Sequence, residues 1–161
     1  MTTEASSVVE AALSAGLTVG CAESLTGGLV ASSIVAISGA SAVFRGGIVA
    51  YDSMLTNDLL GVDASSLARE GAVTAEVATA MAEGAVTRLG VDVAVATTGV
   101  AGPDPDPVSG QSPGAVFIAV AGGGLGTMVR ELSLEGDRTE IRERAARAAL
   151  QALGDAIATR E

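Results

Sequence analysis

The segment VDVAVATT (91–98) is apolar almost without interruption and rich in β-branched residues, which constrains the fold more than any other stretch. A strand of this kind fits the middle of a sheet that is covered on both faces. Strands alternate with helices before it, and a hairpin of two strands at 115–121 and 127–134 follows it. The order of elements predicts a single α/β domain over residues 1–161, a three-layer α/β/α sandwich with a mixed sheet.

The other elements are bounded by capping and turn residues. Apolar spacing predicts helices over 2–15, 29–37, 54–60 and 74–90, and Asp137 with Glu140 forms a capping-box-like start to a last helix through Leu153. Strands are predicted at 18–22 and 46–51. If the first three strands lie side by side and parallel, their ends at 22, 51 and 98 meet at one edge of the sheet, where we place the site.

The inventory of side chains excludes several kinds of catalysis. The chain has no histidine and no lysine, because all nine basic residues are arginine. A Ser-His-Asp triad, a Ser-Lys dyad, a Schiff-base lysine and a P-loop lysine are therefore excluded. Acid–base chemistry falls to carboxylates, the single tyrosine Tyr51 and the single cysteine Cys21.

Charge, hydropathy and cysteine content bear on partners and compartment. The formal net charge of −10 argues against nucleic acid as a main partner. The one cluster of cations, Arg138, Arg142, Arg144 and Arg147, is interpreted as a solvated helix face. No apolar run reaches the length of about 18 residues that a membrane helix needs, and no basic leader segment precedes the first helix. We expect a cytoplasmic protein with a homodimer or other homo-oligomer as its assembly, and no membrane partner.

The turn AESLTGG (22–28) joins a predicted buried strand to a predicted helix. The amides of Thr26, Gly27 and Gly28 would then be free donors at the positive end of the helix, beside the hydroxyls of Ser24 and Thr26. Such a turn suits acyl chemistry with an oxyanion hole, or a nucleotide phosphate held by the backbone. The alternative is an ordinary helix start capped by Thr26.

A long loop at 99–114 contains four glycines and all four prolines of the chain. It is longer than a loop that only connects two elements usually is in a domain of this size, so a functional loop is expected here.

Several separated motifs occur in order and together resemble the CinA C-terminal family. They are AESLTGG (22–28), FRGGIVAY (44–51) with LLGV (59–62), GAV (71–73), TGVAGP (98–103) and GDR (136–138). The resemblance covers most of the chain and is far more specific than any single motif. It implies a nicotinamide-nucleotide amidohydrolase, which converts nicotinamide mononucleotide into nicotinate mononucleotide and ammonia in pyridine nucleotide salvage, with no metal and no cofactor.

The resemblance also assigns catalytic roles. Ser24 matches the nucleophile, and the family's base is a lysine five residues after the tyrosine that matches Tyr51. Thr56 stands at that lysine position in this chain. A threonine hydroxyl cannot accept the serine proton at neutral pH, so a substitute is needed. The candidates are the side chains of Glu23, Tyr51, Asp52 and Asp58.

The same comparison implies substrate-binding positions, namely Glu23, Thr26, Gly27, Gly28, Gly46, Gly47, Thr98, Gly99, Gly102, Pro103 and Arg138. Arg138 is the candidate for the substrate phosphate, and its alternative role is a surface ion pair. Asp104 and Asp106 add negative charge to the long loop, which would repel phosphate or hold a cation. The family's lysine in this loop is also missing, since QSPG (111–114) occupies its region.

Three hypotheses follow. The first is hydrolysis of nicotinamide mononucleotide through Ser24. The second is a non-catalytic nucleotide-binding or assembly module that keeps the pocket without the chemistry. The third and weakest is metal-assisted chemistry through Asp104 and Asp106.

Overall fold

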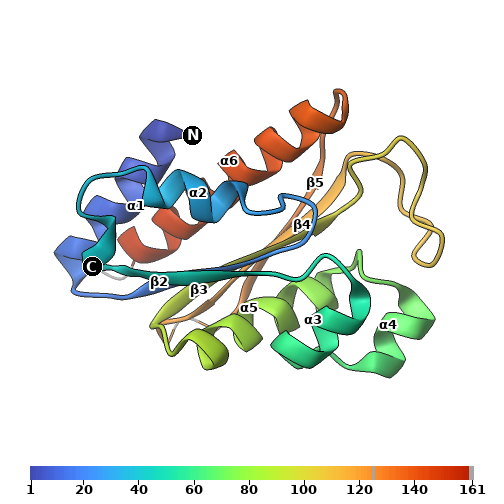
Figure 1. Cartoon of the computed structure of the whole chain (residues 1–161), viewed down its shortest axis with the longest axis horizontal. Coiled ribbons are helices and arrows are strands. Elements are labelled where there is room, and N and C mark those ends of the chain that lie inside the picture. Colours follow the sequence, from blue (N-terminus) through green and yellow to red (C-terminus); the bar gives the residue numbers. More distant parts are fainter. Residues whose placement is uncertain (125, 160–161) are drawn as a thin grey trace.

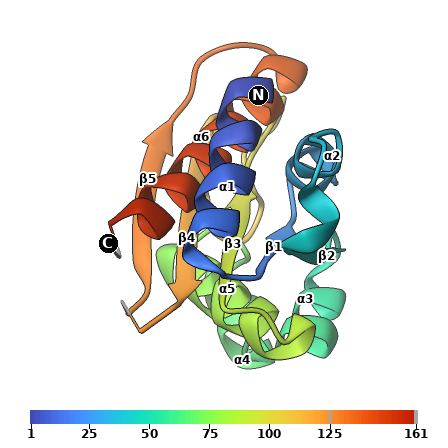
Figure 2. The same cartoon turned by 90° about the vertical axis from the view of Figure 1, so that its left-hand side faces the viewer.

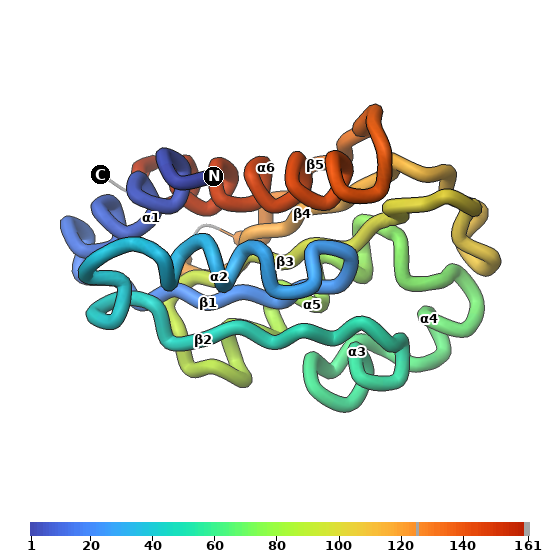
Figure 3. Tube along the Cα trace, turned by 45° about the horizontal axis from the view of Figure 1, so that its top comes forward, coloured from blue at the N-terminus to red at the C-terminus, as the bar shows by residue number. Residues whose placement is uncertain are grey.

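The computed structural model describes residues 1–124 and 126–159, which form a mixed sheet covered by helices on both faces. The strands are β1 (Val19–Glu23), β2 (Phe44–Val49), β3 (Val93–Gly99), β4 (Ala115–Gly122) and β5 (Met128–Ser133). They lie in the order β2-β1-β3-β4-β5, which can be followed in Figure 3. The pairs β1–β2 and β1–β3 are parallel, whereas β3–β4 and β4–β5 are antiparallel. The predicted three-layer fold with a mixed sheet is confirmed.

The helices divide between the two faces of the sheet (Figure 1). On one face lie α1 (Thr2–Ala15), α2 (Leu29–Val35) and α6 (Arg138–Ala158), and on the other lie α3 (Ser53–Leu60), α4 (Ala64–Glu70) and α5 (Ala75–Leu89). Figure 2 shows the same arrangement along the sheet, with α1 and α6 side by side. A short 3₁₀ helix, η1 (Ala40–Ala42), leads into β2.

Each face of the sheet has its own apolar core. Alternating side chains of β1 and β3, among them Val19, Val93 and Val95, pack under α1, α2 and α6. The intervening side chains, such as Ala94 and Ala96, pack against α5 with its buried Met81. The strand β3 is buried on both faces from Val93 to Thr98, as its nearly continuous apolar sequence requires.

Most element boundaries agree with the predictions, and the differences lie near the site. The first helix spans the predicted residues, Thr74 caps α5, and the capping box of Asp137 and Glu140 starts α6. The strand β1 runs to Glu23, whereas β2 ends at Val49, so Tyr51 belongs to the following loop and does not end the strand. The predicted cap of α2 is wrong, because Gly28 occupies the N-cap position instead of Thr26.

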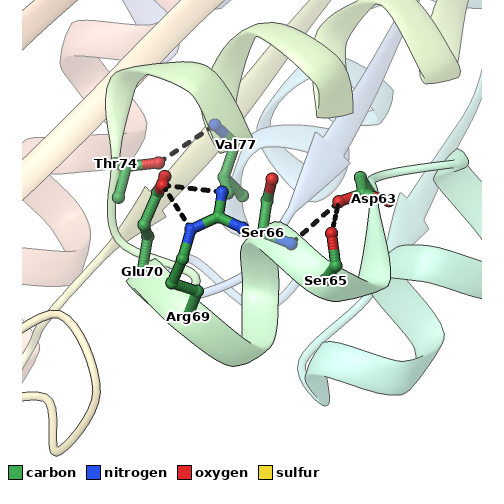
Figure 4. A network of polar contacts seen from close by, with 7 residues as sticks. All are labelled: Asp63, Ser65, Ser66, Arg69, Glu70, Thr74 and Val77. Atoms are coloured by element: carbon green, nitrogen blue, oxygen red, sulfur yellow. Dashed lines mark hydrogen bonds and ion pairs between the residues drawn. The ribbon is translucent and has the colours of Figure 1, made fainter.

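The helix α4 was not expected from apolar spacing, because Leu67 is its one side chain in the buried core. A polar cap lies at its N-terminal end and an exposed ion pair at the other (Figure 4). The carboxylate of Asp63 accepts the amide of Ser66 at 2.8 Å and the hydroxyl of the neighbouring serine. Arg69 forms an ion pair with Glu70 at 2.9 Å at the other end. An aspartate three residues before Ser66 is the N-cap signal that marks this helix in the sequence.

In the part of the chain that the structure describes, every helix is too short or too polar to cross a membrane. The carboxyl ends of β1, β2 and β3 point toward the same end of the sheet, on the right in Figure 1. The loop between β3 and β4, the start of α3 and the start of α6 also lie there. This end of the sheet holds the candidate site.

Candidate functional site

A cavity of about 230 Å³ opens beyond the carboxyl ends of the parallel strands. Its polar lining residues are Ser24, Tyr51, Ser53, Thr98, Asp106 and Arg138. Small or apolar residues complete it, namely Leu25, Ala72, Val73, Gly99 and Ala101. These residues come from four loops, two helix starts and the end of β3, so the fold gathers the cavity from distant parts of the chain.

Ser24 follows β1 directly and is half-buried at the cavity. Its amide donates to the carbonyl of Thr97 at 3.0 Å, which continues the pairing of β1 with β3 and fixes its main chain. Among the residues that the structure describes, no hydrogen bond engages its hydroxyl. A hydroxyl that faces a cavity without a partner is available to a ligand or a reacting group.

The amides of this turn are only partly free, which corrects the sequence expectation. The amide of Gly27 donates to the carbonyl of Ser24 at 3.0 Å, and the amide of Gly28 donates to the carboxylate of Glu23 at 2.9 Å. The amides of Leu25 and Thr26 have no acceptor within the described residues. Leu25 lines the cavity beside Ser24, so its amide is a candidate donor for an oxyanion.

Glu23 is fully buried beneath the start of α2. Its carboxylate accepts the amides of Gly28, Val30 and Ala31 at 2.8–3.1 Å, as a negative group at the positive end of a helix does. The thiol of Cys21 also points to it, at 3.5 Å. Burial, together with the nearby carboxylate, raises the pKa of Cys21 well above its ordinary value, so this thiol stays protonated. Glu23 therefore anchors the helix from outside the cavity.

Arg138 joins three segments at the edge of the cavity. Its Nη2 donates to the hydroxyl of Tyr51 at 3.0 Å, and its Nη1 donates to the carbonyl of Gly102 at 2.8 Å. In the described part of the chain it takes part in no ion pair, which was the alternative role considered for it. Tyr51 is otherwise exposed, so this contact fixes its ring next to the cavity.

Thr56, at the position of the family's lysine, does not line the cavity. Its side chain is 3% exposed, and its hydroxyl donates to the carbonyls of Asp52 at 3.2 Å and Ala50 at 3.5 Å. The carboxylate of Asp52 is occupied as the N-cap of α3, where it accepts the amide of Met54 at 2.8 Å. Neither residue is placed to take a proton from Ser24.

The other predicted binding residues divide into two groups. Thr98 and Gly99 line the cavity, and the hydroxyl of Thr98 donates to the carbonyl of Ala72 at 2.7 Å. Pro103 is exposed after a cis peptide bond with Gly102.

Thr26, Gly46 and Gly47 lie outside the cavity. The hydroxyl of Thr26 pairs with that of Thr97 at 2.7 Å in the core. A Cβ on Gly47 would meet the sulfur of Cys21 at 2.7 Å, so this glycine serves the close packing of the sheet with α2.

Arg142 was not expected at the site. It lies one turn after Arg138 on α6, and its guanidinium donates to the carbonyls of Leu25 at 2.9 Å and Thr26 at 3.0 Å. Arg142 is half-buried in these contacts and is therefore not part of a solvated helix face, whereas Arg138 is exposed but also holds loops of the site. The spacing of four residues is the signal that both point the same way.

Asp106 also lines the cavity, whereas Asp104 is exposed outside it. The Oδ2 atom of Asp106 accepts the amide and the hydroxyl of Ser109 at 2.7 and 2.6 Å. Within the described residues, no group of three or more carboxylate or cysteine side chains could hold a metal ion.

Comparison with known proteins decides the family. The model of the CinA C-terminal domain matches residues 1–157. This chain belongs to the CinA C-terminal domain family. CinA-like proteins of Frankia casuarinae and Synechococcus sp. are 47% identical over 133 residues and 52% identical over 122 residues. These matches cover 83% and 73% of this chain but only 30% and 28% of the relatives, so the chain spans less than a third of their length.

Solved structures of CinA proteins share the whole fold. The competence/damage inducible protein of Agrobacterium tumefaciens superposes with a TM-score of 0.91 at 35% identity, and covers 98% of this chain and 94% of its own. A CinA superfamily protein of Klebsiella pneumoniae gives 0.92 at 29% identity, with 98% of each chain covered. The α/β sandwich that shapes the cavity is thus the fold of the CinA superfamily.

Proposed function

We propose that this CinA domain hydrolyses the carboxamide of nicotinamide mononucleotide, giving nicotinate mononucleotide and ammonia. The observation that carries the proposal is the hydroxyl of Ser24, which has no partner among the described residues and shares a cavity with Arg138. One group is suited to attack a carbonyl and the other to bind a phosphate. The spacing of the family motifs supports the same substrate.

In the proposed reaction, Ser24 Oγ forms a bond to the carboxamide carbon, and the carbonyl electrons move to the oxygen. The amide of Leu25 stabilises that oxyanion. Collapse of the adduct breaks the C–N bond, and the nitrogen leaves as ammonia with the proton that the serine gave up. Water then cleaves the acyl-serine ester, which restores the hydroxyl and releases the carboxylate product.

The proton from Ser24 needs a carrier, because the family's lysine is replaced by a buried threonine. Of the residues that line the cavity, Tyr51, Asp106 and Arg138 have titratable groups. An arginine is always protonated, and a carboxylate with a lowered pKa is a weak base. We therefore assign the relay to Tyr51, whose phenol gives its hydrogen to the leaving nitrogen while its oxygen takes up that of the serine.

The first test measures ammonia released from nicotinamide mononucleotide at neutral and alkaline pH. Ser24→Ala should abolish release, whereas Ser32→Ala, which removes an exposed hydroxyl from α2, should leave it unchanged. Ammonia production by Ser24→Ala at the rate of the parent protein would refute the role of this serine.

The second test introduces the lysine amine of the family at position 56. Loss of a positioned base typically costs about 10² to 10⁴ in rate, so Thr56→Lys should raise the rate by up to that factor. Thr56→Met has a side chain of similar length without the amine and should not. Equal rates in the two variants would show that the amine is not what the site lacks.

A second candidate function rests on the position of Thr56, which is buried and does not line the cavity. With no strong base at the site, the domain would bind the mononucleotide without turning it over. Calorimetric binding with no ammonia release would favour this module, and the absence of any nucleotide binding would exclude both functions.

A further inference from the structure

The cavity has one cationic and one anionic lining group, and neither neutralises the other. Arg138 and Asp106 both line it, yet none of the ion pairs between described residues joins them. Both partners of Arg138 are uncharged, since one is the hydroxyl of Tyr51 and the other is the carbonyl of Gly102. Its positive charge is therefore not paired with any carboxylate of the described residues.

Asp106 likewise forms no ion pair within the part of the chain that the structure describes. Its Oδ2 accepts the amide and hydroxyl of Ser109 and, at 3.3 Å, the amide of Val108, and all three donors are neutral. Partial burial works to raise the pKa of this carboxyl, but the hydrogen bonds outweigh burial and leave the pKa below its ordinary value. Asp106 is thus ionised at neutral pH. Its Oδ1 atom accepts no hydrogen bond within the described part of the chain.

Packing holds the Asp106 turn against the cavity wall. Gly71 adopts φ +81°, and a Cβ there would lie 3.1 Å from Oδ2 of Asp106 and 2.7 Å from the amide of Ser109. The main chain of the 71–73 segment and the long loop are therefore in close contact. The carboxylate is fixed in place and does not move freely in solvent.

We propose that Asp106 selects a ligand with a positively charged ring, while Arg138 takes the anionic end of the same molecule. The inference rests on the proposed function and names the form of its substrate. Oxidised nicotinamide mononucleotide has a pyridinium cation and a phosphate, so it matches both groups. Reduced nicotinamide mononucleotide keeps the phosphate and the carboxamide but has a neutral dihydropyridine ring. The site then discriminates by ring charge, because fixed opposite charges attract strongly in a partly desolvated cavity.

The experiment compares the dissociation constants of oxidised and reduced nicotinamide mononucleotide by calorimetry. It uses protein with Ser24→Ala, so that turnover does not consume the ligand. The oxidised form should bind about 10-fold tighter or more. Adding Asp106→Asn should weaken binding of the oxidised ligand alone, so that the two dissociation constants become nearly equal. Adding Asp104→Asn is the matched control, because it removes the same charge from the same loop outside the cavity, and it should preserve the ratio.

A second measurement needs no change at Asp106. The quantity measured is the dissociation constant of the reduced ligand divided by that of the oxidised ligand. Salt screens the phosphate contacts of both ligands alike, so a fall in this ratio with rising ionic strength reports the ring charge alone. A ratio near one in the Ser24→Ala protein, or a ratio that Asp106→Asn does not alter, would overturn the inference while leaving amide hydrolysis standing. Tight, charge-selective binding without ammonia release from the parent protein would support the inference and refute the hydrolase. Absence of binding by either ligand would overturn both.

Discussion

At the scale of single residues, two arginines one turn apart organise the candidate site. Arg138 holds Tyr51 and Gly102, and Arg142 holds the carbonyls of Leu25 and Thr26. In a trans peptide the N–H points away from the preceding carbonyl, so binding the carbonyl of Leu25 turns the amide of Thr26 away from α6. The guanidinium of Arg142 therefore sets the direction of the main chain beside Ser24.

Removal of the Arg142 guanidinium should destabilise the fold. Arg142→Ala leaves the carbonyl of Leu25 without a donor among the described residues and leaves that of Thr26 with the amide of Leu29 alone. We expect a loss of about 1–3 kcal/mol in the free energy of unfolding, measured with urea. Arg144→Ala removes an exposed arginine from the same helix and should change it by less than about 0.5 kcal/mol. If both variants lose the same stability, the contacts with the turn contribute nothing.

Removal of the Tyr51 hydroxyl should slow the proposed reaction far more than it weakens binding. Tyr51→Phe lacks the proton relay but keeps the ring, so ammonia release should fall by about 10²-fold or more, with little change in the dissociation constant of the substrate. Steady-state rates and calorimetry separate the two effects. A change confined to binding would assign the tyrosine to recognition.

At the scale of elements, two glycines inside helices have opposite roles. Gly84 of α5 faces the backbone of Leu60 at the end of α3, and a Cβ there would overlap the Leu60 carbonyl. Gly154 of α6 has room, because its Cβ would lie 3.7 Å from Val8. Gly84 thus permits the contact of α3 with α5, whereas Gly154 only weakens its helix.

The two substitutions to alanine should therefore differ in sign. Gly84→Ala should cost about 1–3 kcal/mol, since α3 must move away from α5. Gly154→Ala should add about 0.5–1 kcal/mol through helix propensity. Chemical denaturation of both variants under the same conditions tests this, and a stabilised Gly84→Ala protein would contradict the contact.

The start of α4 should respond to pH. Hydrogen bonds from the Ser65 hydroxyl and from Ser66 lower the pKa of Asp63, the N-cap of this helix. A carboxyl whose pKa is lower in the folded state stabilises the fold above its ordinary pKa, and this contribution is lost as the pH falls through the lowered value. Asp63→Asn keeps a capping oxygen without titrating. The difference in unfolding free energy between parent and variant should stay constant near neutrality and change in acid. A difference independent of pH would refute the role of the charge.

The sequence could predict the layers and the strand ends, because those depend on apolar patterns that the chain displays. The strand ends placed Ser24, Thr98 and Gly99 at one edge, and the family resemblance added Arg138; the structure brings all four into one cavity. The sequence could not predict Arg142, whose partners are main-chain carbonyls that no residue pattern marks. The burial of Glu23 under α2 was equally hidden, since it depends on how the helix approaches the strand.

At the scale of the whole molecule, the net charge of −10 is spread over a chain with few cations. Repulsion among carboxylates opposes the compact state, and salt screens it. The melting temperature should therefore rise as sodium chloride is added at neutral pH. Sucrose at equal osmolality is the control for exclusion of the solute from the protein surface. It should raise the melting temperature less than sodium chloride does. A melting temperature that falls with salt would show that attractive pairs dominate.

The contacts of Arg138 have a consequence for synthesis of the chain. One guanidinium connects the start of α6 with Gly102 and Tyr51, which lie 36 and 87 residues earlier in the sequence. While α6 is still inside the ribosome exit tunnel, the β1 and β2 motifs of a nascent polypeptide can be outside, but the cavity is not assembled. The domain therefore cannot capture a metabolite until α6 has emerged.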